Sequence, residues 1–224
     1  MFNNQKLVNR LLAKISEVEK KTLEDLISER IEQEPAVTDR LLGVMQYLLN
    51  HQTIAGVRWR AKTLTDRGRG SQENNYGADF LAALEIDLQG YQVKKGFLAQ
   101  SKLIEPSENF SRANFEKMRE QCEKMLKHSS ASYVFLYSQQ SGITIIPAIE
   151  VLGARNCNPH ELTNRTMRQF YKEHFECFIG DRAIQSATPQ ALRELSERFD
   201  ARSAILISGV DSRTELQLNL FDIE

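Results

Sequence analysis

The sequence predicts an α/β fold with a mixed central β-sheet flanked by helices and an N-terminal helical segment. Three observations support this class. Apolar residues recur at helical spacing through the first part of the chain, they alternate with polar residues over several short stretches after residue 54, and helical spacing returns between and after those stretches. This order of helices, strands, helix, strands and helices is typical of a mixed sheet covered by helices.

Residues 1–50 are expected to form two amphipathic helices. Apolar residues repeat every three or four positions up to residue 34, Pro35 is expected to end the first helix, and Thr38 or Asp39 is expected to cap the second. The repeat does not persist as heptads, which argues against a coiled coil. We therefore predict that this segment packs on the core of the domain that follows.

Residues 51–210 are expected to form the α/β domain. Val57, Trp59 and Ala61 alternate with basic residues, as in a half-exposed strand with one basic face. The same reasoning predicts further strands at 78–88, 96–104, 131–137, 143–146 and 204–207, a turn at 89–95, and helices at 110–128, 166–179 and 189–199. Residues 211–224 are expected to form a C-terminal tail or an edge strand.

The composition limits the classes of function. With 41% hydrophobic and 26% charged residues the chain is an ordinary globular protein, and no apolar run approaches the roughly 20 residues that cross a bilayer. We find no secretory signal, so we expect a cytoplasmic protein without a membrane partner. Cys122, Cys157 and Cys177 do not have metal-binding spacing and are expected to be reduced thiols. A net charge of −1 means that any nucleic-acid site must be a local cluster of basic residues.

Three polar residues of two neighbouring predicted strands carry the most specific chemistry. Gln100 and Lys102 are two apart on one strand and therefore share a face. If the chain turns near Gly90 and Tyr91, antiparallel pairing places Asp79 approximately opposite Lys102. A carboxylate and an amide oxygen suit a hard cation such as Mg²⁺, and a nearby ammonium can orient water or offset phosphate charge. These are the requirements of phosphodiester hydrolysis.

The segments around these residues resemble a nuclease family. GADF at Gly77–Phe80, followed after a hairpin's length of chain by GFLAQSK at Gly96–Lys102, resembles the core of the PD-(D/E)xK superfamily in its Q-x-K variant. The resemblance covers about residues 58–137. It implies a restriction-endonuclease-like fold and a metal-dependent endonuclease with Mg²⁺ or Mn²⁺ as cofactor. Its substrate would be nucleic acid, more often DNA than RNA.

The resemblance also implies a role for each residue. Asp79 is implied to be a metal ligand, Gln100 to replace the usual second acid, and Lys102 to be the catalytic lysine. Members of the superfamily serve restriction, repair or phage defence, so a bacterial defence system with other subunits is the expected setting. The alternative is a nuclease-fold module that binds nucleic acid or protein without cutting, because one site residue departs from the usual acid.

Because an amide replaces the second acid, a compensating carboxylate is expected. Glu73, six residues before Asp79, is the first candidate, and a solvated loop glutamate is the alternative. Glu85 shares a strand face with Asp79 but lies roughly 20 Å away, at about 3.3 Å per residue, too far to share one ion. Gln121 on the following helix either faces the site, as the corresponding helix does in the families resembled, or is a surface residue.

Basic residues gather around this patch in the sequence. A stripe of this kind can neutralise phosphates, the dominant contribution to nonspecific affinity for nucleic acid, although an ordinary solvated strand face is the alternative. The expected nucleic-acid-binding residues are Arg58, Arg60, Lys62, Arg67, Arg69, Lys94 and Lys95.

The C-terminal tail contains a peptide that resembles a docking motif. Gln217, Leu218, Leu220 and Phe221 lie in QLNLF, which resembles the QLxLF peptide by which bacterial replication and repair proteins dock on the sliding clamp. The alternative is an edge strand that pairs with Ala204–Ile207, because leucines alternate with polar residues in the tail.

Overall fold

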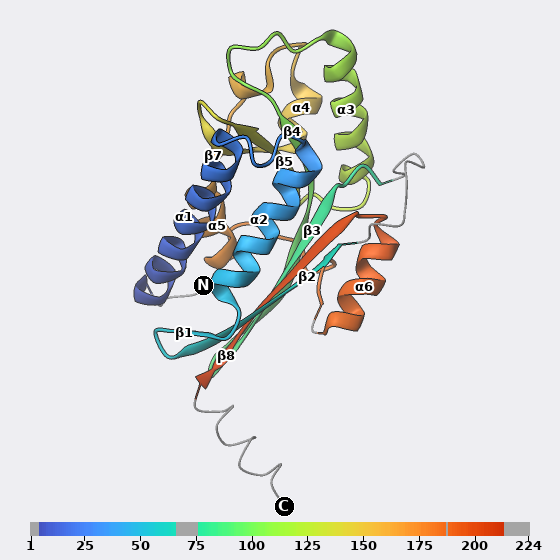
Figure 1. Ribbon diagram of the computed structural model, residues 1–224. Coiled ribbons are helices and arrows are strands. Elements are labelled where there is room, and N and C mark those ends of the chain that lie inside the picture. Colours follow the sequence, from blue (N-terminus) through green and yellow to red (C-terminus); the bar gives the residue numbers. More distant parts are fainter. Residues whose placement is uncertain (1–4, 66–75, 187, 213–224) are drawn as a thin grey trace, which may run out of the picture.

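The computed structural model describes residues 5–65, 76–186 and 188–212. It contains an eight-stranded mixed sheet in the order β1-β2-β8-β3-β4-β5-β6-β7, flanked by helices. The predicted α/β class with an N-terminal helical segment is therefore confirmed (Figure 1). No helix among these residues has both the length and the apolar character needed to span a bilayer.

The helices and strands have the following bounds. The helices are α1 Gln5–Ile27, α2 Glu34–Leu49, α3 Arg112–Leu126, α4 Ala148–Gly153, α5 Met167–Phe175 and α6 Pro189–Arg198. The strands are β1 Gln52–Ile54, β2 Val57–Thr65, β3 Phe80–Leu88, β4 Tyr91–Leu103, β5 Ser132–Ser138, β6 Gly142–Pro147, β7 Arg165–Thr166 and β8 Ser203–Asp211.

The two faces of the sheet bury two separate apolar clusters. The first joins α1, α2 and α5 to one face and includes Leu11, Met45 and Phe97. The second joins α3, α4 and α6 to the other face and includes Leu81 and Met118. Successive residues of a strand point to opposite faces, so a central strand covered on both sides must be apolar throughout. This explains the nearly continuous apolar sequence of β3.

Pro35 begins a helix instead of ending one, so the prediction for this residue was wrong. α1 already ends at Ile27, and Pro35 occupies the first turn of α2. Proline fits there because the first turn needs no main-chain N–H donor. Thr38 is consequently inside the helix, where its hydroxyl contacts the hydroxyls of Ser101 at 2.9 Å and Tyr137 at 3.1 Å.

The hairpin between β3 and β4 is tighter than predicted. Leu88 pairs with Tyr91, so only Gln89 and Gly90 form the turn, and the predicted turn at 89–95 was wrong. Gly90 has φ +79°, a conformation that glycine adopts without steric strain and that two-residue hairpins require. The shorter turn moves the register by two residues.

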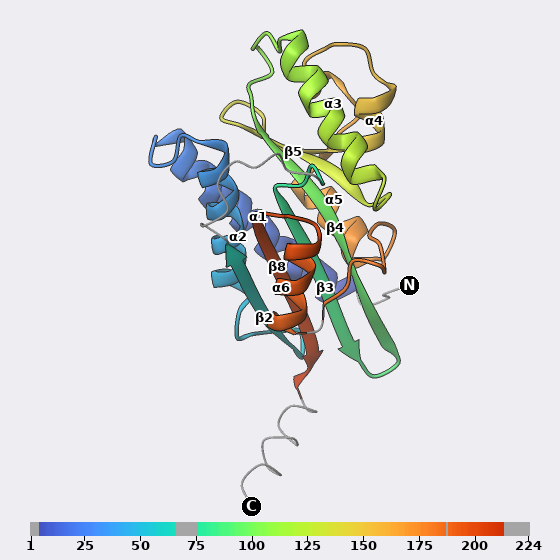
Figure 2. The same cartoon turned by 90° about the vertical axis from the view of Figure 1, so that its right-hand side faces the viewer.

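β8 lies in the centre of the sheet although it is the last described strand. It is antiparallel to β2 and parallel to β3, which occupy its two edges (Figure 2). Ala204–Ile207 therefore has no edge left for another strand, and the proposed pairing of the tail with it was wrong. Gln217, Leu218, Leu220 and Phe221 themselves lie outside the described residues.

Candidate active site

The start of β3 and the last part of β4 bring the three predicted residues to one face of the sheet. Phe80 pairs with Ala99, and the main-chain N–H of Asp79 donates to the Ala99 carbonyl at 2.8 Å. Asp79 consequently lies opposite Gln100, not opposite Lys102 as expected. Lys102 follows on the same face, because it is two residues further along the strand.

A close contact with α3 explains the glycine two residues before Asp79. Gly77 has φ +76°, and a Cβ added there would lie 2.3 Å from the main-chain oxygen of Gln121. No other residue fits so close to this helix. The chain therefore contacts α3 just before β3, and this contact fixes the position of Asp79. The side-chain oxygen of Gln121 is buried and has no hydrogen-bond donor among the described residues.

The Asp79 carboxylate is enclosed and hydrogen-bonded. Its Oδ2 accepts from Gln100 Nε2 at 2.5 Å and from the main-chain N–H of Ser101 at 2.8 Å. Burial raises the pKa of Asp79 to about 6, and the positive charge of Lys102 and the Ser101 hydrogen bond oppose this increase. A nearby cation would favour the ionised carboxylate.

Gln100 presents a buried oxygen that lacks a donor. The side chain is 1% exposed, and Oε1 has no hydrogen-bond partner among the described residues. The orientation of the amide is fixed because Nε2 donates to Asp79. In the flipped orientation the amide oxygen would face the Asp79 carboxylate, and both are acceptors. Buried acceptors are nearly always satisfied in folded proteins. Hard cations prefer carboxylate and carbonyl oxygens as ligands, and this site offers one of each side by side.

Glu34, which the sequence analysis missed, supplies a second carboxylate. Its Oε1 lies 3.5 Å from Lys102 Nζ, and its Oε2 accepts from the Leu103 main-chain N–H at 3.1 Å. The negative charge of Glu34 also raises the pKa of Asp79, although less than burial does. The expected carboxylate Glu73 lies outside the described residues.

Lys102 lies between two elements that cover opposite faces of the sheet. Its ammonium pairs with Glu34 of α2, and its side chain is 16% exposed. On the α3 side it is near Cys122, whose thiol pKa burial raises to about 12 against the opposing charge of Lys102. Lys102 therefore has one carboxylate partner and limited access to solvent.

The donor set fits a magnesium or manganese ion held by few protein ligands. Over residues 5–65, 76–186 and 188–212, no three His, Cys, Asp or Glu side chains form a metal-binding group. Mg²⁺ is commonly held by one or two carboxylates together with waters and substrate phosphates. Asp79 and Glu34 would supply the carboxylates of such a site, and Gln100 would supply a buried amide oxygen.

The basic residues of β2 extend away from the site. Arg58, Arg60 and Lys62 alternate with residues of the buried face. Thr65 pairs with Ser203, which pairs with Phe80, so the end of β2 is level with the site. Arg67 and Arg69 lie outside the described residues.

Of the two hairpin lysines, Lys95 departs from the expectation and Lys94 does not. Lys94 forms an ion pair with Glu85 at 2.7 Å and is half-exposed. Lys95 is 3% exposed, and its ammonium donates to the main-chain oxygens of His174 and Ile179. Burial lowers the pKa of Lys95. A buried ammonium with these partners cannot contact a phosphate, so the expectation for Lys95 needs correction.

Comparison of the chain with protein-family models, with curated proteins and with solved structures found no match. The resemblance to PD-(D/E)xK nucleases therefore depends on Asp79, Gln100 and Lys102 and on the sequence around them.

Proposed function

We propose that this protein is a metal-dependent endonuclease that hydrolyses phosphodiester bonds in nucleic acid, with DNA as the favoured substrate. One observation carries the proposal: the buried Oε1 of Gln100 has no donor among the described residues and lies on the residue that hydrogen-bonds Asp79. A cation ligand is the simplest use of such an oxygen, because leaving a buried acceptor unsatisfied is unfavourable.

The residues divide the chemistry between them. Asp79, Gln100 and Glu34 would hold Mg²⁺ or Mn²⁺, which supplies Lewis-acid polarisation of a phosphate and lowers the pKa of a bound water. Lys102 offsets phosphate charge or orients the attacking water, and Glu34 holds its ammonium next to the site. Asp79 must be ionised to bind a cation, so protonation of this carboxyl at low pH should reduce cleavage.

Substrate binding would use the basic face of β2. Arg60 and Lys62 are exposed on the strand that ends level with Asp79. Neutralisation of phosphates by such residues supplies nonspecific affinity that falls as salt increases. The setting in bacterial restriction or phage defence, with other subunits, stays a prediction from the resemblance.

The test is cleavage by the purified full chain. Supercoiled plasmid and RNA are incubated separately with the protein in Mg²⁺ or in EDTA. We expect nicked or linear plasmid in Mg²⁺ only, and loss of cleavage in Asp79→Ala. Cleavage that persists in EDTA or in Asp79→Ala at the wild-type rate would contradict the proposal.

A nuclease-fold binding module is the second candidate function. It is favoured by the amide of Gln100 at the position of the usual acid and by the absence of a three-residue acidic or His/Cys group among the described residues. This candidate predicts salt-dependent binding of DNA or RNA with no cleavage under any metal. The two candidates therefore give opposite results with plasmid in Mg²⁺ or Mn²⁺.

We also propose the sliding clamp as a partner of the C-terminal peptide at 217–221. The two occupied edges of β8 leave Ala204–Ile207 unable to pair with this peptide, which supports the proposal. Deletion of residues 217–224 should abolish binding to purified clamp and leave the melting temperature unchanged. Absence of clamp binding by the intact chain would reject this partner.

A further inference from the structure

One arginine lies next to Asp79 on the side opposite Gln100. Phe80 pairs with Ser203 of β8 and with Ala99 of β4, and the main-chain N–H of Ser203 donates to the Asp79 oxygen at 3.1 Å. Continued by one residue, this register sets Arg202, Asp79 and Gln100 in a row across three neighbouring strands. Neighbouring strands are about 4.8 Å apart.

The guanidinium of Arg202 is held by α2. Its nitrogens donate to Asp39 at 3.2 and 3.4 Å and to the Pro35 carbonyl at 2.9 Å. Ser203 Oγ donates to the same Asp39 carboxylate at 2.9 Å, so the carboxylate is fixed from both sides. This arrangement orients the arginine at the end of the sheet.

Arg202 is accessible to solvent, and its positive charge affects Asp79. Its side chain is 34% exposed, and its charge is among the influences that lower the pKa of Asp79 against the effect of burial. The Nε–H donates to no described residue, whereas the terminal nitrogens are hydrogen-bonded. A planar guanidinium with donors left over suits recognition of a phosphate better than a lysine ammonium does.

Arg202 also connects two surfaces that already carry charge. In the sheet order, β8 lies between β2, which carries Arg60 and Lys62, and β3, which Asp79 precedes. Lys102 lies on the far side of Asp79, on β4. Thr65 pairs with Ser203 and Ser203 with Phe80, so Arg202 lies between the end of β2 and Asp79, at the end of the sheet. Figure 2 shows the start of β8 between β2 and β3.

We propose that Arg202 binds a backbone phosphate of the nucleic acid beside Asp79, and that Asp39 is the positioning residue for its guanidinium. The identity of this ligand rests on the proposed function. Stability alone does not account for the pair, since half-exposed ion pairs contribute little to folding.

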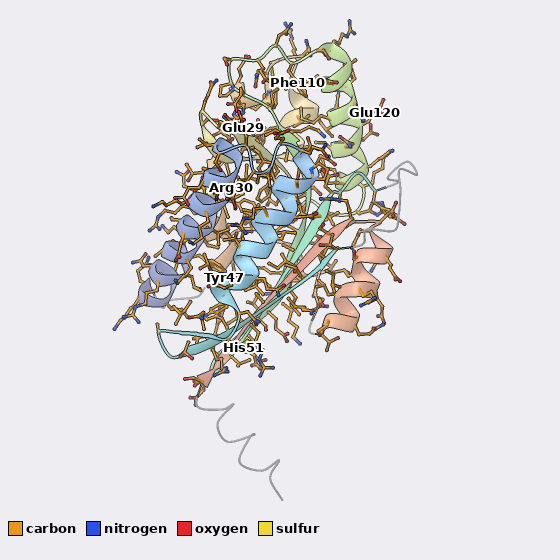
Figure 3. The ribbon with its side chains drawn as sticks, viewed as in Figure 1. Glu29, Arg30, Tyr47, His51, Phe110 and Glu120 are labelled. Atoms are coloured by element: carbon orange, nitrogen blue, oxygen red, sulfur yellow. The ribbon has the colours of Figure 1, made fainter. Side chains whose placement is uncertain are left out.

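A neighbouring ion pair provides a matched control. Arg40 follows Asp39 on α2 but turns to α1, where Arg40 Nε lies 2.5 Å from Asp25 Oδ2. Arg30, which lies in the turn after α1 and is labelled in Figure 3, shares the same aspartate at 2.9 Å. Arg40→Gln therefore removes an arginine of similar exposure and pairing from a position that faces away from the row.

The experiment measures binding of a short duplex by fluorescence anisotropy in EDTA over a salt series. Arg202→Gln should reduce the log–log salt slope by about 0.9 and weaken binding on the order of tenfold. Arg202→Lys and Asp39→Asn should keep the slope and lose part of the affinity, since charge remains and orientation is lost. Arg40→Gln should match the wild type in both.

The outcomes separate this inference from the proposed function. A slope in Arg202→Gln equal to that of Arg40→Gln and of the wild type overturns the inference, even if the protein cleaves DNA. A changed slope in a chain that never cleaves supports the inference and rejects the nuclease. A wild type without affinity for DNA or RNA overturns both. If Arg202→Gln fails to fold, Arg202→Gln/Asp39→Asn leaves no unpaired carboxylate and is measured in its place.

Discussion

Two lysines near opposite ends of β4, Lys95 and Lys102, have different kinds of partner. Near the hairpin, Lys95 is buried and donates to two main-chain carbonyls at the end of α5. Near the site, Lys102 pairs with the Glu34 carboxylate and stays partly exposed. Two main-chain carbonyls keep the Lys95 ammonium in one place. The ion pair of Lys102 with Glu34 can instead be replaced by an ion pair with another anion, such as a phosphate. The type of hydrogen-bonding partner therefore distinguishes Lys95, a structural lysine, from Lys102, which is free to act on a substrate in the proposed function.

The largest effect is expected at Lys102. Lys102→Met should reduce metal-dependent cleavage on the order of 10²-fold or more, because it removes the positive charge that most favours the ionised form of Asp79. The free energy of unfolding should change by less than about 1 kcal/mol, since a partly exposed ion pair stabilises the fold only weakly. Initial rates on plasmid and urea denaturation check the two statements. Full activity in Lys102→Met would contradict the proposed catalytic role of Lys102 and, with it, the contrast between Lys102 and Lys95.

Asp79→Asn should stabilise the metal-free protein at neutral and alkaline pH. The folded-state pKa of about 6 lies above the usual 3.8, so folding favours the protonated acid and loses stability as pH rises through about 6. Asparagine carries no charge, and the gain should be about 1–3 kcal/mol above pH 7 and vanish below about pH 4. Urea denaturation in EDTA at several pH values measures it. An equal difference at all pH values would contradict the buried-carboxylate explanation.

Lys95→Met should behave in the opposite way to Lys102→Met. It removes a buried ammonium donor from the carbonyls of His174 and Ile179, although the His174 carbonyl keeps the main-chain N–H of Cys177, and should destabilise the fold by about 1–3 kcal/mol. The salt slope of nucleic-acid binding should not change. Denaturation and anisotropy on the same preparation test both parts, and a reduced slope with unchanged stability would restore Lys95 to the nucleic-acid surface.

The smallest effect is expected on the β2 face. Arg60→Glu combined with Lys62→Glu should lower the salt slope by about 0.9 for each lost contact with duplex phosphate, without affecting cleavage at saturating substrate. Lys94→Glu is the comparison, because Lys94 already pairs with Glu85 at the far end of the hairpin. An unchanged slope in the β2 variant would place phosphate binding elsewhere.

Local patterns predicted the elements and the common face of the site residues. Gln100 and Lys102 share a face because side chains alternate along a regular strand, and β4 pairs without interruption through both residues. Their register with Asp79 was predicted two residues away, because it depends on whether the turn is centred before or after Gly90. Alternation therefore indicates which residues can meet, and turn geometry decides which ones do.

Distant partners could not be predicted. Glu34 and Arg202 reach the site from α2 and from the start of β8, and neither has a sequence pattern linking it to Asp79. An acid beside Pro35 is typical of a helix start and gave only a weak signal. Lys95 has the same local sequence character as Lys94, and only the packing of α5 against β4 buries it.

The central position of β8 has a consequence for protein synthesis. β2, β3 and β4 leave the ribosome well before β8, yet β8 is the strand that joins β2 to β3. Until it arrives, Asp79 lacks the Ser203 N–H and the neighbouring Arg202. A translation product that stops before Arg202 contains Asp79, Gln100 and Lys102 but cannot assemble the row across three strands. We therefore expect the proposed site to form only once residues 202–211 are part of the chain.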